Sequence, residues 1–193
     1  MSIYDFFENI YYTISHQIHP NLVDLILNQW NLLRPGYEVI DIGAGEGKLD
    51  LELLNHIDVH FEFCDIDREK LASIPSKSSV SINVTDVSEL DFPDESFDVA
   101  FCINALHHFE KPELSIREVI RVLKKNGKLL IVDYESQALL TRIFNIIAKV
   151  QKRHRHFFTL FELTKYLKYL GLNTQSIRIN HFQIAIIAGK RGD

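Results

Sequence analysis

The chain has 193 residues, of which 46% are apolar and 24% charged, and its formal net charge is −5. This length and composition predict one soluble globular domain with a sizeable core. No apolar run reaches the ~20 residues needed to cross a bilayer, and the N-terminus lacks a signal-peptide pattern, so we expect a cytoplasmic location.

Charge is distributed unevenly along the chain. From Arg142 to Asp193 there are ten Lys or Arg and two Asp or Glu, so this third is basic and the remainder is strongly acidic. A basic region can face an anionic substrate, nucleic acid or a membrane surface, and it can equally be ordinary solvated surface. These interpretations stay open at the level of sequence.

Two helices are expected before the first strand. Residues 2–15 and Asn21–Leu33 both place apolar side chains at spacings of three and four, and Pro35-Gly36 ends the second helix.

The stretch Tyr37–Lys48 predicts a buried parallel strand, a glycine turn and the start of a helix. An apolar run is interrupted by Asp41 and followed by three glycines: Gly43, Gly45 and Gly47. Glycine lets the chain turn sharply and lets its backbone approach a ligand closely. A dinucleotide-binding turn would need glycine at position 48, where this chain has lysine.

Acidic residues follow the next two predicted strands. Val59–Cys64 is followed by Asp65, whose carboxylate suits a ribose because it can accept from both hydroxyls. Asp67 is expected to cap the helix Arg68–Ile74. A third strand, Val80–Val84, precedes Asp86 in the same way.

The two cysteines, Cys64 and Cys102, fall in the second strand and in the fourth, Val99–Ile103. If these strands flank the first one, about two strand spacings of ~4.8 Å separate the thiols, which is too far for a disulfide. Both are expected to be free, and neither belongs to a Cys-x-x-Cys metal pair.

The remaining elements complete an alternating α/β pattern. They are expected as a helix at Arg117–Leu123 stopped by Asn126-Gly127, a strand at Leu129–Val132, an apolar helix at Ser136–Lys149, a helix at Leu160–Leu170 capped by Thr159, and an antiparallel pair at Ser176–Asn180 and Phe182–Ala188.

The glycine turn resembles motif I of the class I S-adenosylmethionine-dependent methyltransferases. The chain from residue 37 to 135 further resembles the small-molecule methyltransferases (type 11) related to those of ubiquinone and menaquinone biosynthesis. The stretches that carry this resemblance are Asp86, Phe92-Pro93-Asp94-Glu95-Ser96-Phe97-Asp98-Val99, Leu106-His107-His108-Phe109, Arg117-Glu118-Val119 and Arg121–Leu129.

The resemblance implies a Rossmann-like α/β fold. The expected sheet has seven mostly parallel strands in the order 3-2-1-4-5-7-6, an antiparallel last strand, and helices on both faces. The chain would be a single methyltransferase domain, with an N-terminal helical cap at 1–35, a cofactor-binding core at 37–135, and a helical cover plus β-hairpin at 136–193. Tyr4, Tyr11 and Tyr12 would be lid aromatics or simple packing residues.

The resemblance also implies methyl transfer from S-adenosylmethionine to a small-molecule acceptor whose nucleophile (O, N or C) is undetermined. Asp41 and the turn would hold the methionine end, Asp65 the ribose, and Asp86 with Val87 the adenine. The full set of cofactor residues would be Asp41, Gly43, Ala44, Gly45, Gly47, Asp65, Ile66, Asp86, Val87, Ile103 and Asn104.

Candidate catalytic residues are His107 and His108, which follow the fourth strand. Either histidine could deprotonate an incoming hydroxyl or carbon acid, and the competing interpretation is that both pack or form hydrogen bonds. His154 and His156, with Arg153 and Arg155, could recognise an anionic acceptor or lie on solvated surface.

Other function classes stay open as alternatives. The first is a catalytically inactive partner subunit of the same fold. The second is a nucleotide-sugar or NAD-dependent enzyme, which Lys48 disfavours. The third is an RNA methyltransferase, for which the only support is the basic C-terminal third. Methylation of the exocyclic amines of bases is typical of enzymes with the motif Asn-Pro-Pro-Tyr after the fourth strand. Residues 104–107 instead read Asn-Ala-Leu-His, which argues against that reaction. We therefore expect no nucleic-acid partner, no metal site, and a monomer or homodimer.

Overall fold

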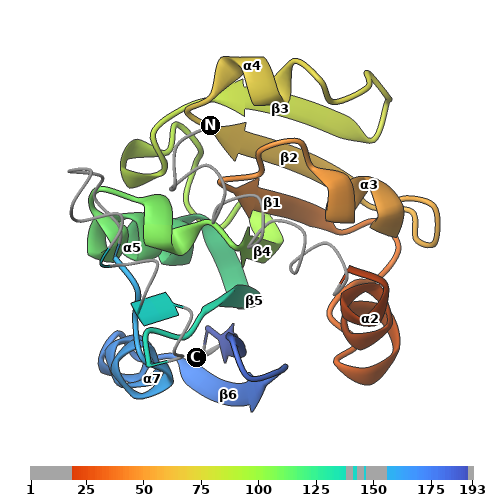
Figure 1. Ribbon diagram of the computed structural model, residues 1–193. Coiled ribbons are helices and arrows are strands. Elements are labelled where there is room, and N and C mark those ends of the chain that lie inside the picture. The colour runs from red at the N-terminus through yellow and green to blue at the C-terminus, as the bar shows by residue number, and fades with distance from the viewer. Residues whose placement is uncertain (1–18, 138–140, 143–145, 147–155, 191–193) are drawn as a thin grey trace.

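The structure is a computed structural model that describes residues 19–137, 141–142, 146 and 156–190. Seven strands form one sheet in the order β3-β2-β1-β4-β5-β7-β6 (Figure 1). The strands are β1 (Glu38–Ile42), β2 (His60–Asp65), β3 (Val80–Val84), β4 (Phe97–Ile103), β5 (Leu123–Tyr134), β6 (Asn173–Arg178) and β7 (Gln183–Gly189). The predicted strand order is confirmed.

Strand direction places the carboxyl ends of the central strands on one edge. β1, β2, β3, β4 and β5 pair in parallel, whereas β7 is antiparallel to both β5 and β6. The antiparallel last strand is therefore confirmed. In an open α/β sheet, ligands bind beyond the carboxyl ends of the strands, where the strand order reverses, and here that is the boundary between β1 and β4.

Helices cover both faces of the sheet, as the sequence predicted. They are α2 (His19–Asp24), the π-helical turn η1 (Leu25–Gln29), α3 (Lys48–Leu53), α4 (Arg68–Leu71), the 3₁₀ turns η2 (Val87–Glu89) and η3 (Leu106–His108), α5 (Pro112–Val122) and α7 (Leu160–Tyr169). Successive strand residues point to opposite faces of the sheet and contribute to two hydrophobic cores. Ile40 and Ile42 belong to the core that contains side chains of α5 and α7, and Val39 belongs to the core that contains side chains of α2 and α3.

Several predicted boundaries were wrong. The second helix ends near Gln29 instead of Leu33, and β6 begins at Asn173, three residues before the predicted start. Asn126-Gly127 does not stop a helix: α5 ends at Val122, and β5 begins at Leu123, paired with Phe97. The register then shifts, so that Lys128 pairs with Val99 and the residues between form a bulge with Asn126 at φ 65°.

Other local predictions are confirmed. Asp67 caps α4 by accepting from the backbone N–H groups of Glu69 and Lys70, and Thr159 forms a capping box with Glu162 at the start of α7. Cys64 and Cys102 are both free and buried, on the two strands that flank β1.

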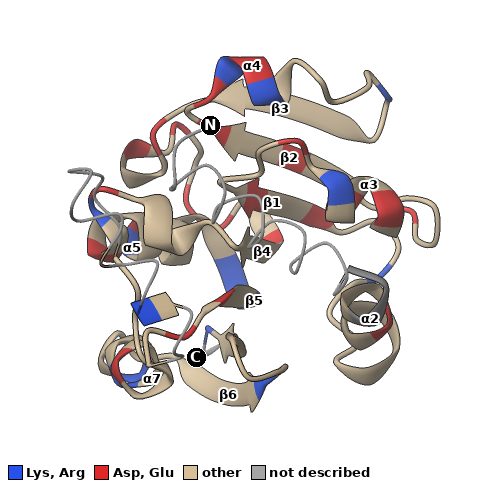
Figure 2. Ribbon diagram, viewed as in Figure 1, with Lys and Arg blue, Asp and Glu red and all other residues tan. Residues whose placement is uncertain are grey.

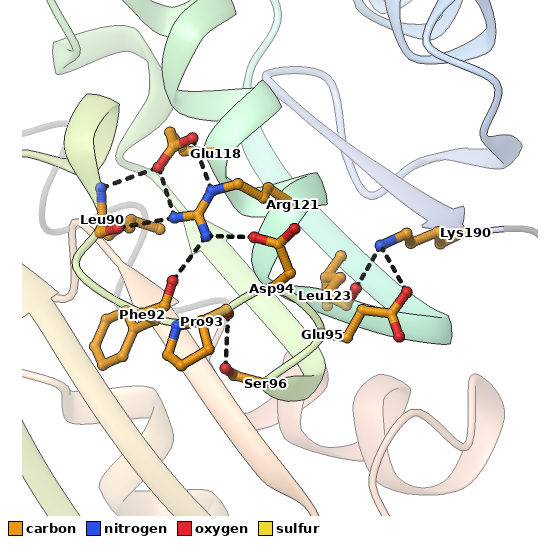
Figure 3. Close-up of polar contacts among 10 residues, drawn as sticks. All are labelled: Leu90, Phe92, Pro93, Asp94, Glu95, Ser96, Glu118, Arg121, Leu123 and Lys190. Carbon is orange, nitrogen blue, oxygen red and sulfur yellow. Dashed lines mark hydrogen bonds and ion pairs between the residues drawn. The ribbon is translucent and has the colours of Figure 1, made fainter.

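The acidic turn before β4 is anchored to α5 by one arginine (Figure 3). Arg121 donates to both carboxylate oxygens of Glu118, to the carboxylate of Asp94 over 2.8 Å, and to the backbone carbonyls of Leu90 and Phe92. The hydrogen bond from Arg121 lowers the pKa of the Glu118 carboxyl. Residues that carry the family resemblance here therefore hold a loop in place.

Parts of the expected organisation lie outside the described residues. These are the helix at 2–15 with its three tyrosines, most of the helix at 136–149, and His154 with Arg153 and Arg155. The division into cap, core and cover stays a prediction, as do the cytoplasmic location and the oligomeric state. Within the described part of the chain, no helix has the length and apolarity needed to cross a membrane.

Candidate active site

The glycine turn after β1 is required by packing as well as by backbone conformation. Gly43, Gly45 and Gly47 have φ values of 73°, 56° and 60°, in the left-handed region that other residues rarely adopt. A Cβ atom on Gly43 would lie 2.5 Å from the Cβ of Ala105, and one on Gly47 would lie 2.5 Å from Cε1 of Phe63.

Gly45 differs from Gly43 and Gly47, because a Cβ atom placed on it would meet no close contact. The nearest atom to a Cβ placed there is the flexible Lys70 Cδ at 3.8 Å. The fold leaves space beside this backbone, and a ligand can approach it closely.

The turn is tied to the end of β2. The N–H groups of Gly43 and Ala44 donate to the carbonyl of Cys64 over 2.7 and 3.1 Å, and the N–H of Gly45 donates to Oδ2 of Asp65 over 2.8 Å. The other oxygen of Asp65 accepts from the N–H of Asp67 over 2.9 Å. These bonds fix the Asp65 carboxylate beside Gly45.

Next to Asp65, Ile66 is 74% exposed. Asp86 lies at the end of the neighbouring strand β3 and caps η2 by accepting from the N–H of Ser88 over 2.8 Å, while Val87 is buried. The chain around Asp86 joins that around Asp65 through the N–H of Thr85, which donates to the carbonyl of Asp65 over 3.0 Å. Acidic residues are frequent on the segments that follow β2 and β3 (Figure 2).

Beneath the turn, two carboxyl groups are buried against each other. Asp41 on β1 is 4% exposed and Asp50 on α3 is 2% exposed, and their side chains form a hydrogen bond. Burial, together with the charge of Asp50, raises the pKa of Asp41 well above its ordinary value. Burial raises the pKa of Asp50 to about 7.

The end of β4 is held in an unusual conformation. Asn104 has φ 53°, its N–H donates to the carbonyl of Val132 over 2.7 Å, and its Oδ1 accepts from Nε2 of Gln183 over 2.8 Å. Asn104, which follows the half-buried Ile103 at the end of β4, is therefore held in place by contacts to β5 and β7.

His107 forms a buried pair with Asp133. Its Nδ1 lies 2.6 Å from Oδ1 of Asp133, and its backbone N–H donates to Oδ2 over 3.0 Å. The imidazole ring also stacks on Phe157 with centroids 4.9 Å apart, and it meets the ring of Tyr134 edge-on at 5.5 Å. In the described part of the chain no hydrogen bond reaches Nε2, and the side chain of His107 is 5% exposed.

The loop that carries His107 lies against the glycine turn. Ala105 and Phe109 are the residues that a Cβ on Gly43 would meet, at 2.5 and 3.1 Å. The loop that carries the His107–Asp133 pair and the glycine turn therefore lie at the same carboxyl edge of the sheet. His108 is exposed, and its ring centroid lies 4.1 Å from that of His107.

Residues 40–131 match the family model described as a methyltransferase domain. The matched stretch runs from β1 to β5 and contains the glycine turn, Asp65 and His107. Residues 40–131 are thus a methyltransferase domain of this family.

Curated relatives share this domain over part of their length. The methyltransferase YcgJ of Bacillus subtilis is 35% identical over 109 residues, which are 52% of this chain and 42% of the relative. Phosphoethanolamine N-methyltransferase 3 of Arabidopsis thaliana is 31% identical over 107 residues, 53% of this chain and 22% of the relative. The chain thus spans less than half the length of these relatives.

Solved structures of methyltransferases share the fold over most of the chain. The crystal structure of YcgJ superposes with a TM-score of 0.74 at 21% identity, covering 92% of this chain and all of that one. Phosphoethanolamine N-methyltransferase 2 of Haemonchus contortus, in complex with S-adenosyl-L-methionine, gives 0.77 at 18% identity, covering 89% of this chain and 53% of that one.

Within this methyltransferase fold, the expected cofactor residues gather at one edge of the sheet, as do both histidines. Sequence reasoning missed Asp50, Asp133 and Gln183, which are the buried partners of Asp41, His107 and Asn104. Asp50 carried a usable signal, because it is a charged residue within the leucine-rich start of a helix. Asp133 and Gln183 carried none, because their side chains reach the site only through the strand register.

Proposed function

We propose that the protein transfers a methyl group from S-adenosylmethionine to a small-molecule acceptor. The observation that carries the proposal is the glycine turn of a methyltransferase domain, tied at Gly45 to the Asp65 carboxylate over 2.8 Å. The relative named phosphoethanolamine N-methyltransferase acts on a small molecule, which supports that class of acceptor.

The residues present fit the cofactor. The open side of Gly45 leaves room for backbone contact, and Asp41 keeps a buried Oδ1 without a hydrogen-bond partner in the described part of the chain. Asp65 would hold the ribose, Asp86 and Val87 the adenine with the exposed Ile66 against its ring, and Ile103 with Asn104 the methionine end. When bound, the cofactor supplies a methyl group already activated on a sulfonium, so the protein must position the acceptor and remove its proton.

His107 is the proposed base. An ionised Asp133 accepts from Nδ1 and so leaves the lone pair on Nε2, which is the arrangement by which a carboxylate fixes the tautomer of a catalytic histidine. A base of this kind is needed for a hydroxyl, a carbon acid or an ammonium acceptor. His108 is exposed, and we propose no proton transfer for it.

The test is transfer of a deuterated methyl group. The protein is incubated with S-adenosylmethionine labelled at the methyl and with a small-molecule extract, total RNA or total protein in separate reactions, and products are identified by mass spectrometry. The proposal expects a labelled small molecule and formation of S-adenosylhomocysteine. Label found only in RNA or protein would contradict the acceptor class.

Two variants then test the base. His107→Gln should lower turnover by about 10²–10⁴-fold, the usual contribution of a positioned general base. His108→Gln is the matched control and should stay near the wild-type rate. Equal rates for His107→Gln and the wild type would remove the base role.

A further inference from the structure

The buried pair of Asp41 and Asp50 is not explained by packing alone. The two carboxyl groups form a hydrogen bond to each other, and a carboxylate can only accept. One of the two must therefore carry a proton. In each residue Oδ1 has no hydrogen-bond partner among the described residues. Asp41 as a whole is only 4% exposed and Asp50 only 2%.

The titratable groups that act on Asp41 are carboxyls and thiols. The carboxyls of Asp50 on α3 and of Asp65 on β2 both act to raise the pKa of Asp41. The remaining titratable neighbours are the thiols of Cys64 on β2 and Cys102 on β4, which also interact electrostatically with Asp41. None of these groups supplies positive charge, so a cation brought to this place would stabilise the ionised form of the pair.

The pair brackets the turn that would hold the amino-acid end of the cofactor. Asp41 precedes Gly43 by two positions, and Asp50 follows Gly47 by three. The cofactor carries an ammonium group at that end, which can provide the missing positive charge.

We propose that the Asp41–Asp50 pair receives the cofactor's ammonium group and releases one proton to solvent when it does so. At a pH below the one at which Asp50 ionises, the pair begins with two protons. One stays in the hydrogen bond between the carboxyls and the other passes to the buffer, which leaves one negative charge opposite the ammonium. This inference rests on the proposed function, and it makes Asp50 a further cofactor-binding residue whose protonation sets the affinity.

The consequence is that cofactor affinity depends on pH. Because burial raises the pKa of Asp50 to about 7, the second proton is bound below that pH and absent above it. The dissociation constant should therefore decrease by up to about tenfold per pH unit as the pH rises toward 7, because one proton is released per ligand bound.

The experiment is titration calorimetry of the full chain with S-adenosylhomocysteine, which carries the ammonium but no sulfonium. Binding enthalpies are compared in two buffers of different ionisation enthalpy, at about pH 6 and about pH 8, and their difference gives the protons released. We expect release approaching one proton at the lower pH. Binding at the lower pH with no release would overturn the inference.

Two variants assign the proton. Asp50→Asn keeps the shape of the side chain, removes the carboxyl whose pKa lies at about 7, and can donate to Asp41, so the pH range of proton release should move away from that of the wild type. Glu52→Gln removes an exposed charge from the same helix and should behave as wild type. A pH profile of release that is unchanged in Asp50→Asn would place the proton elsewhere and contradict the inference.

A third ligand separates the ammonium from the rest of the cofactor. Binding of 5′-methylthioadenosine, which lacks the amino-acid end, should release no proton, and release equal to that with S-adenosylhomocysteine would overturn the inference. If a folded wild-type protein binds no S-adenosylhomocysteine at all, the proposed function itself fails.

Discussion

Nδ1 of His107 lies 2.6 Å from Oδ1 of Asp133, and both side chains are almost completely buried. Asp133 also accepts from the backbone N–H groups of His107 and Tyr134, over 3.0 and 2.7 Å. Three donors thus hold one carboxylate, which in turn holds one imidazole ring at the site.

This relationship predicts the tautomer of His107. With the proton on Nδ1, facing Asp133, the Nε2 lone pair is free, and ¹⁵N NMR of the neutral ring should show that form. In Asp133→Asn the amide can donate to Nδ1, so the proton should move to Nε2. A wild-type ring already protonated at Nε2 would contradict the proposed base.

The glycine turn predicts a difference between two alanine variants. Gly47→Ala forces a Cβ to within 2.5 Å of the Phe63 ring at φ 60°, and strain plus overpacking should lower the free energy of unfolding by about 2–4 kcal/mol. Gly36→Ala is the control, because φ is 81° there and nothing lies within 4 Å, so only about 1 kcal/mol is expected. Chemical denaturation measures the free energy of unfolding of both variants. Equal losses would show that the contact with Phe63 adds nothing to the cost of the substitution at Gly47.

The hydrogen bonds of Arg121 are expected to stabilise the loop before β4. Arg121→Ala removes the donors to Glu118 and Asp94 and leaves the carbonyls of Leu90 and Phe92 without their partner, so we expect a loss of about 2–3 kcal/mol. Arg117→Ala, at an exposed position of the same helix, should change the free energy of unfolding by less than about 0.5 kcal/mol. A small loss at position 121 would mean that the loop is held by other contacts.

The Asp41–Asp50 pair predicts an unusual pH dependence of stability. A carboxyl whose pKa is raised in the folded state binds its proton more tightly there than in the unfolded chain. Its stabilising contribution is therefore present at low pH and is lost as pH rises from about 4 through about 7. Each pKa unit between the two states is worth about 1.4 kcal/mol.

Denaturation of wild type and Asp50→Asn across that pH range is the measurement. The difference between their free energies of unfolding should shift in favour of the variant as pH increases. A difference that is independent of pH would mean that Asp50 does not titrate in this interval.

The sequence was sufficient for the architecture because two signals agreed. The apolar strands around Val39 and Val99, each buried on both faces, specify a parallel sheet, and the glycine turn specifies where its ligand edge lies. Asp65 and His107 could be selected from the sequence because Asp65 ends β2 and His107 lies four positions after the end of β4, at that edge.

The partners of these residues could not be predicted in the same way. His107 and Asp133 are 26 positions apart, and they meet because Ile103 of β4 pairs with Val132 of β5. A register of this kind depends on the bulge at residues 124–127, which sequence reasoning assigned to the end of a helix. The orientation of Asp50 depends likewise on how α3 rotates against the sheet.

The most direct test of the cofactor site is thermal unfolding of the full chain with S-adenosylhomocysteine, alongside NAD and ATP. At about 100 times its dissociation constant a ligand adds about 2.7 kcal/mol, or roughly 2–4 °C for a domain of this size. We predict that shift for S-adenosylhomocysteine alone, its loss in Asp65→Ala, and its retention in Asp67→Ala, where the α4 cap and an ion pair with Lys70 are removed. No shift at millimolar S-adenosylhomocysteine, or an equal shift with NAD, would contradict the account.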